Sequence, residues 1–129
     1  LGFDSVGVEP SKPLAKIGIE NFKLNIMNCT LEDSSFSTNS IDIITAIDVF
    51  EHLTNPKSFL NKSYKILKNN GILVIKVPNG NYTLTKLKIA KFLRKRTENM
   101  DIFVSYEHVA RYNKKNLENI ISKLTYERN

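Results

Sequence analysis

The sequence predicts an α/β fold built on a mostly parallel sheet with helices on its faces. Three observations predict it. Apolar, β-branched runs alternate along the chain with segments of helical periodicity, which is typical of a parallel sheet. The runs Ile41–Ile47 and Gly71–Val77 are almost wholly apolar, as expected of strands buried on both faces. Turn residues follow each run, and 129 residues suffice for one domain.

The first elements are short. Ser5–Glu9 is rich in β-formers and stops at Pro10, so it predicts a strand. Ser11 is suited to cap a helix that holds Pro13 in its first turn. Lys23–Met27 predicts the second strand, before a polar, turn-rich stretch and the apolar run at 41–47.

A second helix should begin at Asn55, with Asn as N-cap and Pro56 at the first helical position. Asn69-Asn70-Gly71 should end it, since these residues tolerate positive φ. Its apolar face is predicted to comprise Phe59, Leu60, Tyr64 and Leu67.

Two further helices are predicted towards the C-terminus. Thr83–Arg96 has the periodicity of an amphipathic, basic helix, and Asn113 should cap a last helix that runs to Leu124.

Composition narrows the function classes. The chain is 41% hydrophobic and 25% charged, which is ordinary for a globular protein. With one cysteine, it is expected in a reducing, cytoplasmic compartment. A single cysteine, Cys29, excludes an internal disulfide and a cysteine-based metal cage. No apolar run reaches the roughly 18 residues of a membrane span, so stable membrane insertion is not expected. The first residues, LGFD, lack an initiator Met and a signal peptide, and we expect the start to be internal to a longer reading frame.

The positive charge is concentrated in one segment. The chain has 19 basic and 13 acidic residues. Six of the basic residues lie between Lys86 and Arg96 with no acid among them, and without them the basic count also falls to 13. This local excess argues against a general nucleic-acid-binding face. It indicates either a solvated helix face or a surface for an anionic acceptor or membrane.

Doubly wound α/β folds bind ligands beyond the carboxyl ends of their strands. Glu9 falls at such a position. Its carboxylate could accept hydrogen bonds from both hydroxyls of a ribose, or it could be an ordinary solvated loop acid. Neither histidine has a second histidine at metal-ligand spacing, so no metal site is predicted.

Several motifs, in order, resemble class I S-adenosylmethionine-dependent methyltransferases that act on small molecules. The resemblance covers residues 1 to 124. DVFEHL at 48–53 is close to that family's "DVLEHL", and LKNNGILVI at 67–75 to its "LKPGGLLVI". The other matching segments are VGVEPS at 6–11, LEDSSF at 31–36, SIDII at 40–44, VPN at 77–79 and EHV at 107–109 with Asn113 and Leu117.

The resemblance implies a partial Rossmann-like methyltransferase fold. The family's first strand, which lies at the centre of the sheet, and its GxGxG loop are missing, because no Gly-x-Gly occurs in the chain. Residues 1–129 are therefore expected to be a single methyltransferase domain fragment, with about 81–112 forming a lid or substrate insert.

The resemblance also implies S-adenosylmethionine as cofactor and assigns its site. The Thr30 hydroxyl could accept a hydrogen bond from the adenine amine, or Thr30 could belong to an ordinary turn. Asp48 could line the cofactor site, or it could be an acidic residue at the start of a helix. His52 and His108 are candidate general bases, although either could serve packing instead. The predicted cofactor-binding residues are Glu9 for the ribose with its neighbours Pro10 and Ser11, then Thr30, Leu31 and Glu32 for the adenine, and Ile47, Asp48 and Val49 for the methionine end.

The expected function is methyl transfer from S-adenosylmethionine to a small-molecule O, N or C nucleophile. Two alternatives stay open: a truncated, non-catalytic module, since the fragment alone could be inactive, and a nicotinamide-dependent oxidoreductase of Rossmann type, against which DVFEHL and VPN argue. The expected partner is a small-molecule acceptor, which in one alternative is anionic. A nucleic acid is not expected. The sequence makes no prediction of oligomeric state.

Overall fold

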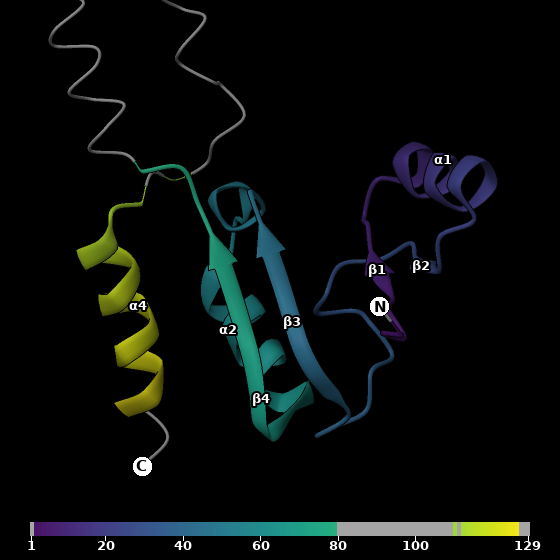
Figure 1. The fold of residues 1–129 in the computed structure, drawn as a ribbon. Coiled ribbons are helices and arrows are strands. Elements are labelled where there is room, and N and C mark those ends of the chain that lie inside the picture. The colour runs from purple at the N-terminus through teal and green to yellow at the C-terminus, as the bar shows by residue number, and fades with distance from the viewer. Residues whose placement is uncertain (1, 80–109, 111, 127–129) are drawn as a thin grey trace, which may run out of the picture.

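The computed structural model describes residues 2–79, 110 and 112–126 (Figure 1). The predicted basic helix at 83–96, His108 and most of the predicted insert at 81–112 lie outside them. The described elements are β1 (Gly7–Val8), α1 (Lys12–Phe22), β2 (Ile26–Met27), β3 (Ile41–Ile47), the short 3-10 helix η1 (Phe50–His52), α2 (Pro56–Ile66), β4 (Leu67–Lys76) and α4 (Lys114–Tyr126).

The described strands form two parallel pairs. β1 pairs with β2, with Gly7 opposite Ile26, and β3 pairs with β4, with Ile44 opposite Leu73. Each pair is a separate two-stranded sheet within the described residues. In Figure 1 the arrowheads of β1, β3 and β4 point towards the same end of the molecule. The predicted α/β class with parallel strands is confirmed.

β1 and β2 are shorter than the predicted Ser5–Glu9 and Lys23–Met27. Two backbone hydrogen bonds extend the pairing, from Gly7 N to Asn25 O at 2.8 Å and from Glu9 N to Met27 O at 3.0 Å. Helix α1 packs on β2, where Gly18 lies so close to Ile26 that a side chain at position 18 would overlap it. A glycine in the helix interior is thus explained by close approach of the strand.

β3 has the predicted bounds, but one face of β3 and β4 is partly open. Ala46 is buried, and Leu73 and Ile75 pack with it against the core. The alternate residues point the other way and are 41–55% exposed: Ile43, Ile47, Ile72 and Val74. Burial of these strands on both faces, as predicted, is therefore wrong for the described residues, because the residues that cover the sheet come from α2 and α4 on one face.

Helix α2 begins as predicted. The Asn55 side chain accepts a hydrogen bond from Ser58 N at 3.1 Å, and Pro56 occupies the first turn. The predicted apolar face is partly wrong, because Tyr64 is 68% exposed. The predicted Phe59 and Leu60 are buried, and Ser63 and Ile66 complete the buried face.

The end of α2 differs from the prediction. The helix stops at Ile66, and Leu67 already pairs with Ile41. The register then jumps, so that Ile43 lies opposite Ile72 and residues 68–71 form an irregularity in β4. None of Asn69, Asn70 and Gly71 is among the positive-φ residues of the described chain. Backbone N–H groups of Asn39 and Ser40 instead satisfy the last helix carbonyls, at 3.1 and 2.8 Å.

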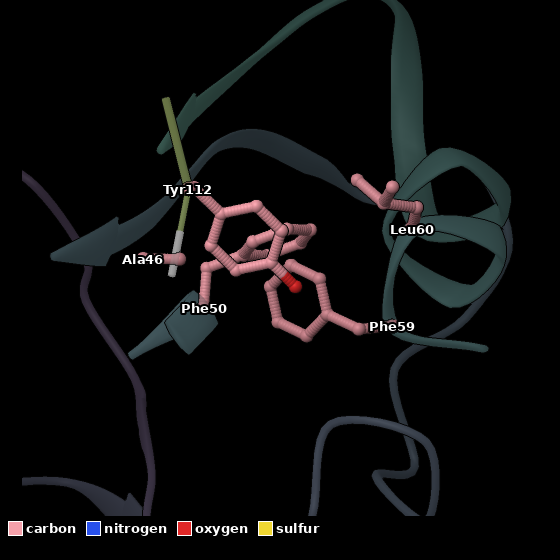
Figure 2. Close-up of a cluster of buried hydrophobic side chains, with 5 residues drawn as sticks. All are labelled: Ala46, Phe50, Phe59, Leu60 and Tyr112. Carbon is pink, nitrogen blue, oxygen red and sulfur yellow. The ribbon is translucent and has the colours of Figure 1, made fainter. Parts of the chain in front are cut away.

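The core lies between the covered face of β3 and β4 and the helices α2 and α4. Its buried members are Ala46, Phe50, Phe59, Leu60 and Tyr112 (Figure 2). Leu117 and Ile120 of α4 pack against this cluster. Asn113 caps α4, as predicted, by accepting from Asn116 N at 2.9 Å. No helix among the described residues is long and apolar enough to cross a membrane.

Candidate functional site

Glu9 lies where β1 gives way to α1. Its Oε1 accepts a hydrogen bond from the backbone N–H of Ser11 at 2.7 Å, so the side chain is folded over the start of the helix. The residue is half-buried. Asn28, just beyond β2, donates from Nδ2 to the carbonyl oxygens of Glu9 and Pro10 at 2.8 and 3.2 Å. These contacts hold the predicted ribose-binding residues in one defined turn.

The loop after β2 is a compact turn. The Thr30 hydroxyl donates to Asp33 Oδ2 at 2.7 Å and accepts from Asp33 N at 3.2 Å. Ser34 donates from N and from Oγ to the carbonyl of Leu31, and Lys62 of α2 donates to Ser34 O at 2.7 Å. Thr30 therefore takes part in an ordinary turn, which was the alternative to a role in cofactor binding. Its hydroxyl already makes two hydrogen bonds to Asp33.

Asp48 follows β3 directly and has an unusual backbone conformation, with φ +52°. Its N–H donates to Lys76 O at 2.9 Å, and its Oδ2 lies 3.2 Å from Lys76 Nζ. Both side chains are more than half exposed, so the ion pair is a weak one. Ile47 and Val49, on either side of Asp48, are also exposed at 47% and 43%.

His52 is exposed in η1, and its N–H donates to Val49 O at 3.0 Å. Packing under the next helix was the alternative to a catalytic role for His52. Because the residue is exposed, it does not pack there. The residue before it has the opposite environment: Glu51 is only 2% exposed.

Residues 110 and 112 lie against this loop. Ala110 N donates to Glu51 O at 3.0 Å. The Tyr112 ring lies 5.2 Å from the Phe50 ring, centroid to centroid, with the planes tilted by 53°. Burial, and after it the charge of Glu51, raises the pKa of Tyr112 above its usual value.

Sequence reasoning missed Asn28, Lys76 and Tyr112. Only Lys76 carried a signal, as the one charged residue in an otherwise apolar strand run. The contacts of Asn28 and Tyr112 join segments 18 and 62 residues apart in the chain, which no local pattern reveals.

A metal centre and a surface hollow are the other kinds of site considered among the described residues. No group of three or more His, Cys, Asp and Glu side chains there could hold a metal ion. A shallow hollow of about 590 Å³ lies beside the irregularity at 68–71 and is lined in part by Asp42, Lys68 and Asn39. It lies at the start of β3, opposite the edge that carries Asp48, so it is not the predicted cofactor site.

The chain is similar to known proteins over nearly its whole length. A family model described as a methyltransferase domain matches residues 1–127. A ubiquinone biosynthesis O-methyltransferase of Bradyrhizobium sp. (strain ORS 278) is 29% identical over 122 residues, which are 87% of this chain and 48% of that protein. One of Rhodopseudomonas palustris (strain HaA2) is 30% identical and is matched over 81% of this chain and 46% of its own length. The chain thus spans about half the length of the curated relatives it matches.

Solved structures have the same fold. A SAM-dependent methyltransferase from Thermotoga maritima, described as a possible histamine N-methyltransferase, superposes with a TM-score of 0.72 at 20% identity, covering 93% of this chain and 53% of that one. A SAM-dependent methyltransferase from Archaeoglobus fulgidus gives 0.71 at 19% identity, over 95% and 51%. The family predicted from the sequence motifs is confirmed, and S-adenosylmethionine is the cofactor that this membership implies. With its parallel strands, its motifs and a match over residues 1–127, the chain belongs to the methyltransferase domain family.

Proposed function

We propose that the protein carrying this chain transfers a methyl group from S-adenosylmethionine to a small-molecule acceptor. The observation that best supports the proposal is the Glu9 carboxylate, held at the carboxyl end of β1 by Ser11 N–H, within a chain of the methyltransferase domain family. The curated relatives are named ubiquinone biosynthesis O-methyltransferases, which favours an oxygen nucleophile.

The end of β1 fits a nucleoside. A carboxylate has about four acceptor positions, and the hydrogen bond from Ser11 N uses one of those of Glu9. Capacity therefore remains for the two hydroxyls of a ribose. The Thr30 hydroxyl fits less well, since it donates to Asp33 and accepts from it, which leaves one lone pair for an adenine amine. Backbone groups of Leu31 and Glu32 are the better partners for the base.

At the other end, Ile47, Asp48 and Val49 would hold the methionine part. Asp48 Oδ2 and Lys76 Nζ together offer one negative and one positive group there, which suits a ligand that carries both an ammonium and a carboxylate. When bound, S-adenosylmethionine supplies an electrophilic methyl group on a sulfonium. The chain's own task is then to align the acceptor oxygen with that carbon and to exclude water.

Methylation of a hydroxyl requires that its proton leave. The exposed imidazole of His52, four residues after Asp48, is our candidate base. His108, which lies outside the described residues, is the second candidate. Neither ring is needed if the acceptor is already ionised. Cys29 is a free thiol, which supports a reducing compartment such as the cytoplasm.

The intact protein, with methyl-labelled S-adenosylmethionine and a panel of catechols, phenols and amines, tests the proposal. We expect cofactor binding by calorimetry and label transfer to at least one hydroxyl compound. NAD serves as the competitor that represents the oxidoreductase alternative. Binding of NAD without binding of S-adenosylmethionine would overturn the proposal, and cofactor binding without transfer to any acceptor would favour the non-catalytic alternative.

A further inference from the structure

The loop after β3 has two sides with opposite environments. On one side Phe50 and Glu51 are 0% and 2% exposed. On the other, Asp48 and Val49 are exposed. The loop is therefore held by its buried side while it presents the two residues that are proposed to meet the cofactor.

The buried side is held from two distant parts of the chain. Phe50 contacts two rings, Phe59 of α2 at 5.9 Å in an edge-to-face arrangement and Tyr112 at 5.2 Å (Figure 2). Such aromatic pairs stabilise a contact beyond the effect of the apolar area that they bury. Tyr112 is itself only 5% exposed, so this contact is dry.

A backbone contact fixes the same place. Ala110 N donates to Glu51 O at 3.0 Å, so residues 110 and 112 contact two successive residues of η1. The exposed side is braced as well, since Asp48 N donates to Lys76 O and His52 N to Val49 O. Asp48 lies two peptide units from Phe50, so a shift of the Phe50 backbone also displaces Asp48, whose positive φ already restricts its conformation.

We propose that Tyr112 is a positioning residue for the cofactor site: its ring holds Phe50, and through it the Asp48–Val49 backbone, in the binding conformation. The inference rests on the proposed function for its ligand. Tyr112 is the last residue of the segment expected to form the insert, and it directly precedes Asn113, the N-cap of α4. The residue that anchors α4 to the core thus also sets the geometry of the loop after β3.

The test compares variants of the intact protein. Tyr112→Leu removes the ring, Tyr112→Met does so with a side chain that fills space more flexibly, and Tyr112→Phe keeps the ring without the hydroxyl. Leu60→Ala is the matched control, because Leu60 belongs to the same buried cluster but lies on α2. Amide hydrogen exchange at Asp48 and His52, cofactor affinity by calorimetry and the thermal midpoint are measured for each.

We expect Tyr112→Leu and Tyr112→Met to speed exchange at the Asp48 and His52 amides and to weaken cofactor binding about tenfold or more, because a displaced binding loop loses its alignment. Tyr112→Phe should behave as the parent. Leu60→Ala should lower the thermal midpoint but leave the affinity within about twofold at temperatures where both proteins are folded.

Equal loss of affinity in Leu60→Ala and Tyr112→Leu would show a merely structural role and overturn the inference. Unchanged exchange at Asp48 and His52 in both ring-deletion variants would overturn it as well, whatever the protein binds. A parent that binds no S-adenosylmethionine contradicts the proposed function, whereas a parent that binds it as tightly as Tyr112→Leu contradicts only the role of Tyr112.

Discussion

The Glu9 carboxylate and the Ser11 backbone N–H are joined by a hydrogen bond of 2.7 Å that spans the junction of β1 and α1. Ser11 is the N-cap residue of α1, and its own side chain makes no capping hydrogen bond. The carboxylate two residues earlier thus satisfies an N–H at the helix start. The same bond orients the charge of Glu9 at the edge of the sheet where a ligand is proposed.

Replacement of Glu9 by glutamine should separate charge from shape. The glutamine oxygen can still accept from Ser11 N, so the turn should persist, but the charge and part of the accepting capacity are lost. Hydrogen bonds to a charged acceptor contribute about 1.5–3 kcal/mol, so binding of S-adenosylmethionine should weaken about 10- to 150-fold. Calorimetry on the intact protein measures it. The control is Glu20→Gln, an exposed carboxylate whose Oε1 lies 3.9 Å from Lys16 Nζ. Equal affinities for parent and Glu9→Gln would make Glu9 an ordinary loop acid.

The positive φ of Asp48 predicts a graded response to substitution. Asn tolerates the left-handed region at least as well as Asp, whereas a β-branched residue there is strained. Asp48→Asn should leave the free energy of unfolding within about 0.5 kcal/mol of the parent, since the exposed pair with Lys76 contributes little. Asp48→Val should lower it by about 1–2 kcal/mol. Urea unfolding of both variants measures these free energies. Equal stabilities of the two variants would contradict the positive φ at Asp48.

Tyr112 should make the protein sensitive to high pH. Its pKa is raised, first by burial and then by the Glu51 carboxylate, so the folded state keeps the phenol proton after the unfolded state has lost it. Stability from this group is therefore complete below about pH 10 and falls as pH rises from there through the folded-state pKa, by about 1.4 kcal/mol for each pH unit between the two values. Urea unfolding from pH 8 to 11 should show a steeper decline for the parent than for Tyr112→Phe. Parallel curves for the two proteins would contradict the raised pKa.

The basic run at 86–96 lies outside the described residues, and its role stays a prediction from the sequence. If it attracts an anionic acceptor, replacing Lys91, Arg94 and Lys95 with glutamine should raise the KM for that acceptor, and added salt should do the same to the parent. A control with the same change of net charge replaces Lys12, Lys16 and Lys23, which are exposed in and beside α1. If both triple variants have the parent's KM, the basic run is only a solvated helix face.

The sequence by itself determined those features that depend on neighbouring residues. The N-caps Asn55 and Asn113 each accept from a backbone N–H three residues on, a contact that the backbone of any helix start offers. The bounds of β3 follow from a run rich in β-branched residues between the polar Ser40 and Asp48. The family also followed from the sequence, because each motif is a short run of neighbouring residues and their order can be read along the chain.

The tertiary structure alone decided features that depend on distant partners. Helix α2 stops at Ile66 and not at Asn69, because Leu67 pairs with Ile41 and the amides of Asn39 and Ser40 bond the last carbonyls. Tyr64 fits the helical period of the predicted apolar face, but Ser63 and Ile66 took the buried side once the helix packed on β4 and α4. The contact between Phe50 and Tyr112 joins residues 62 positions apart. Period and propensity describe one element at a time, whereas register, helix rotation and such contacts are set only when two elements bury their surfaces against each other.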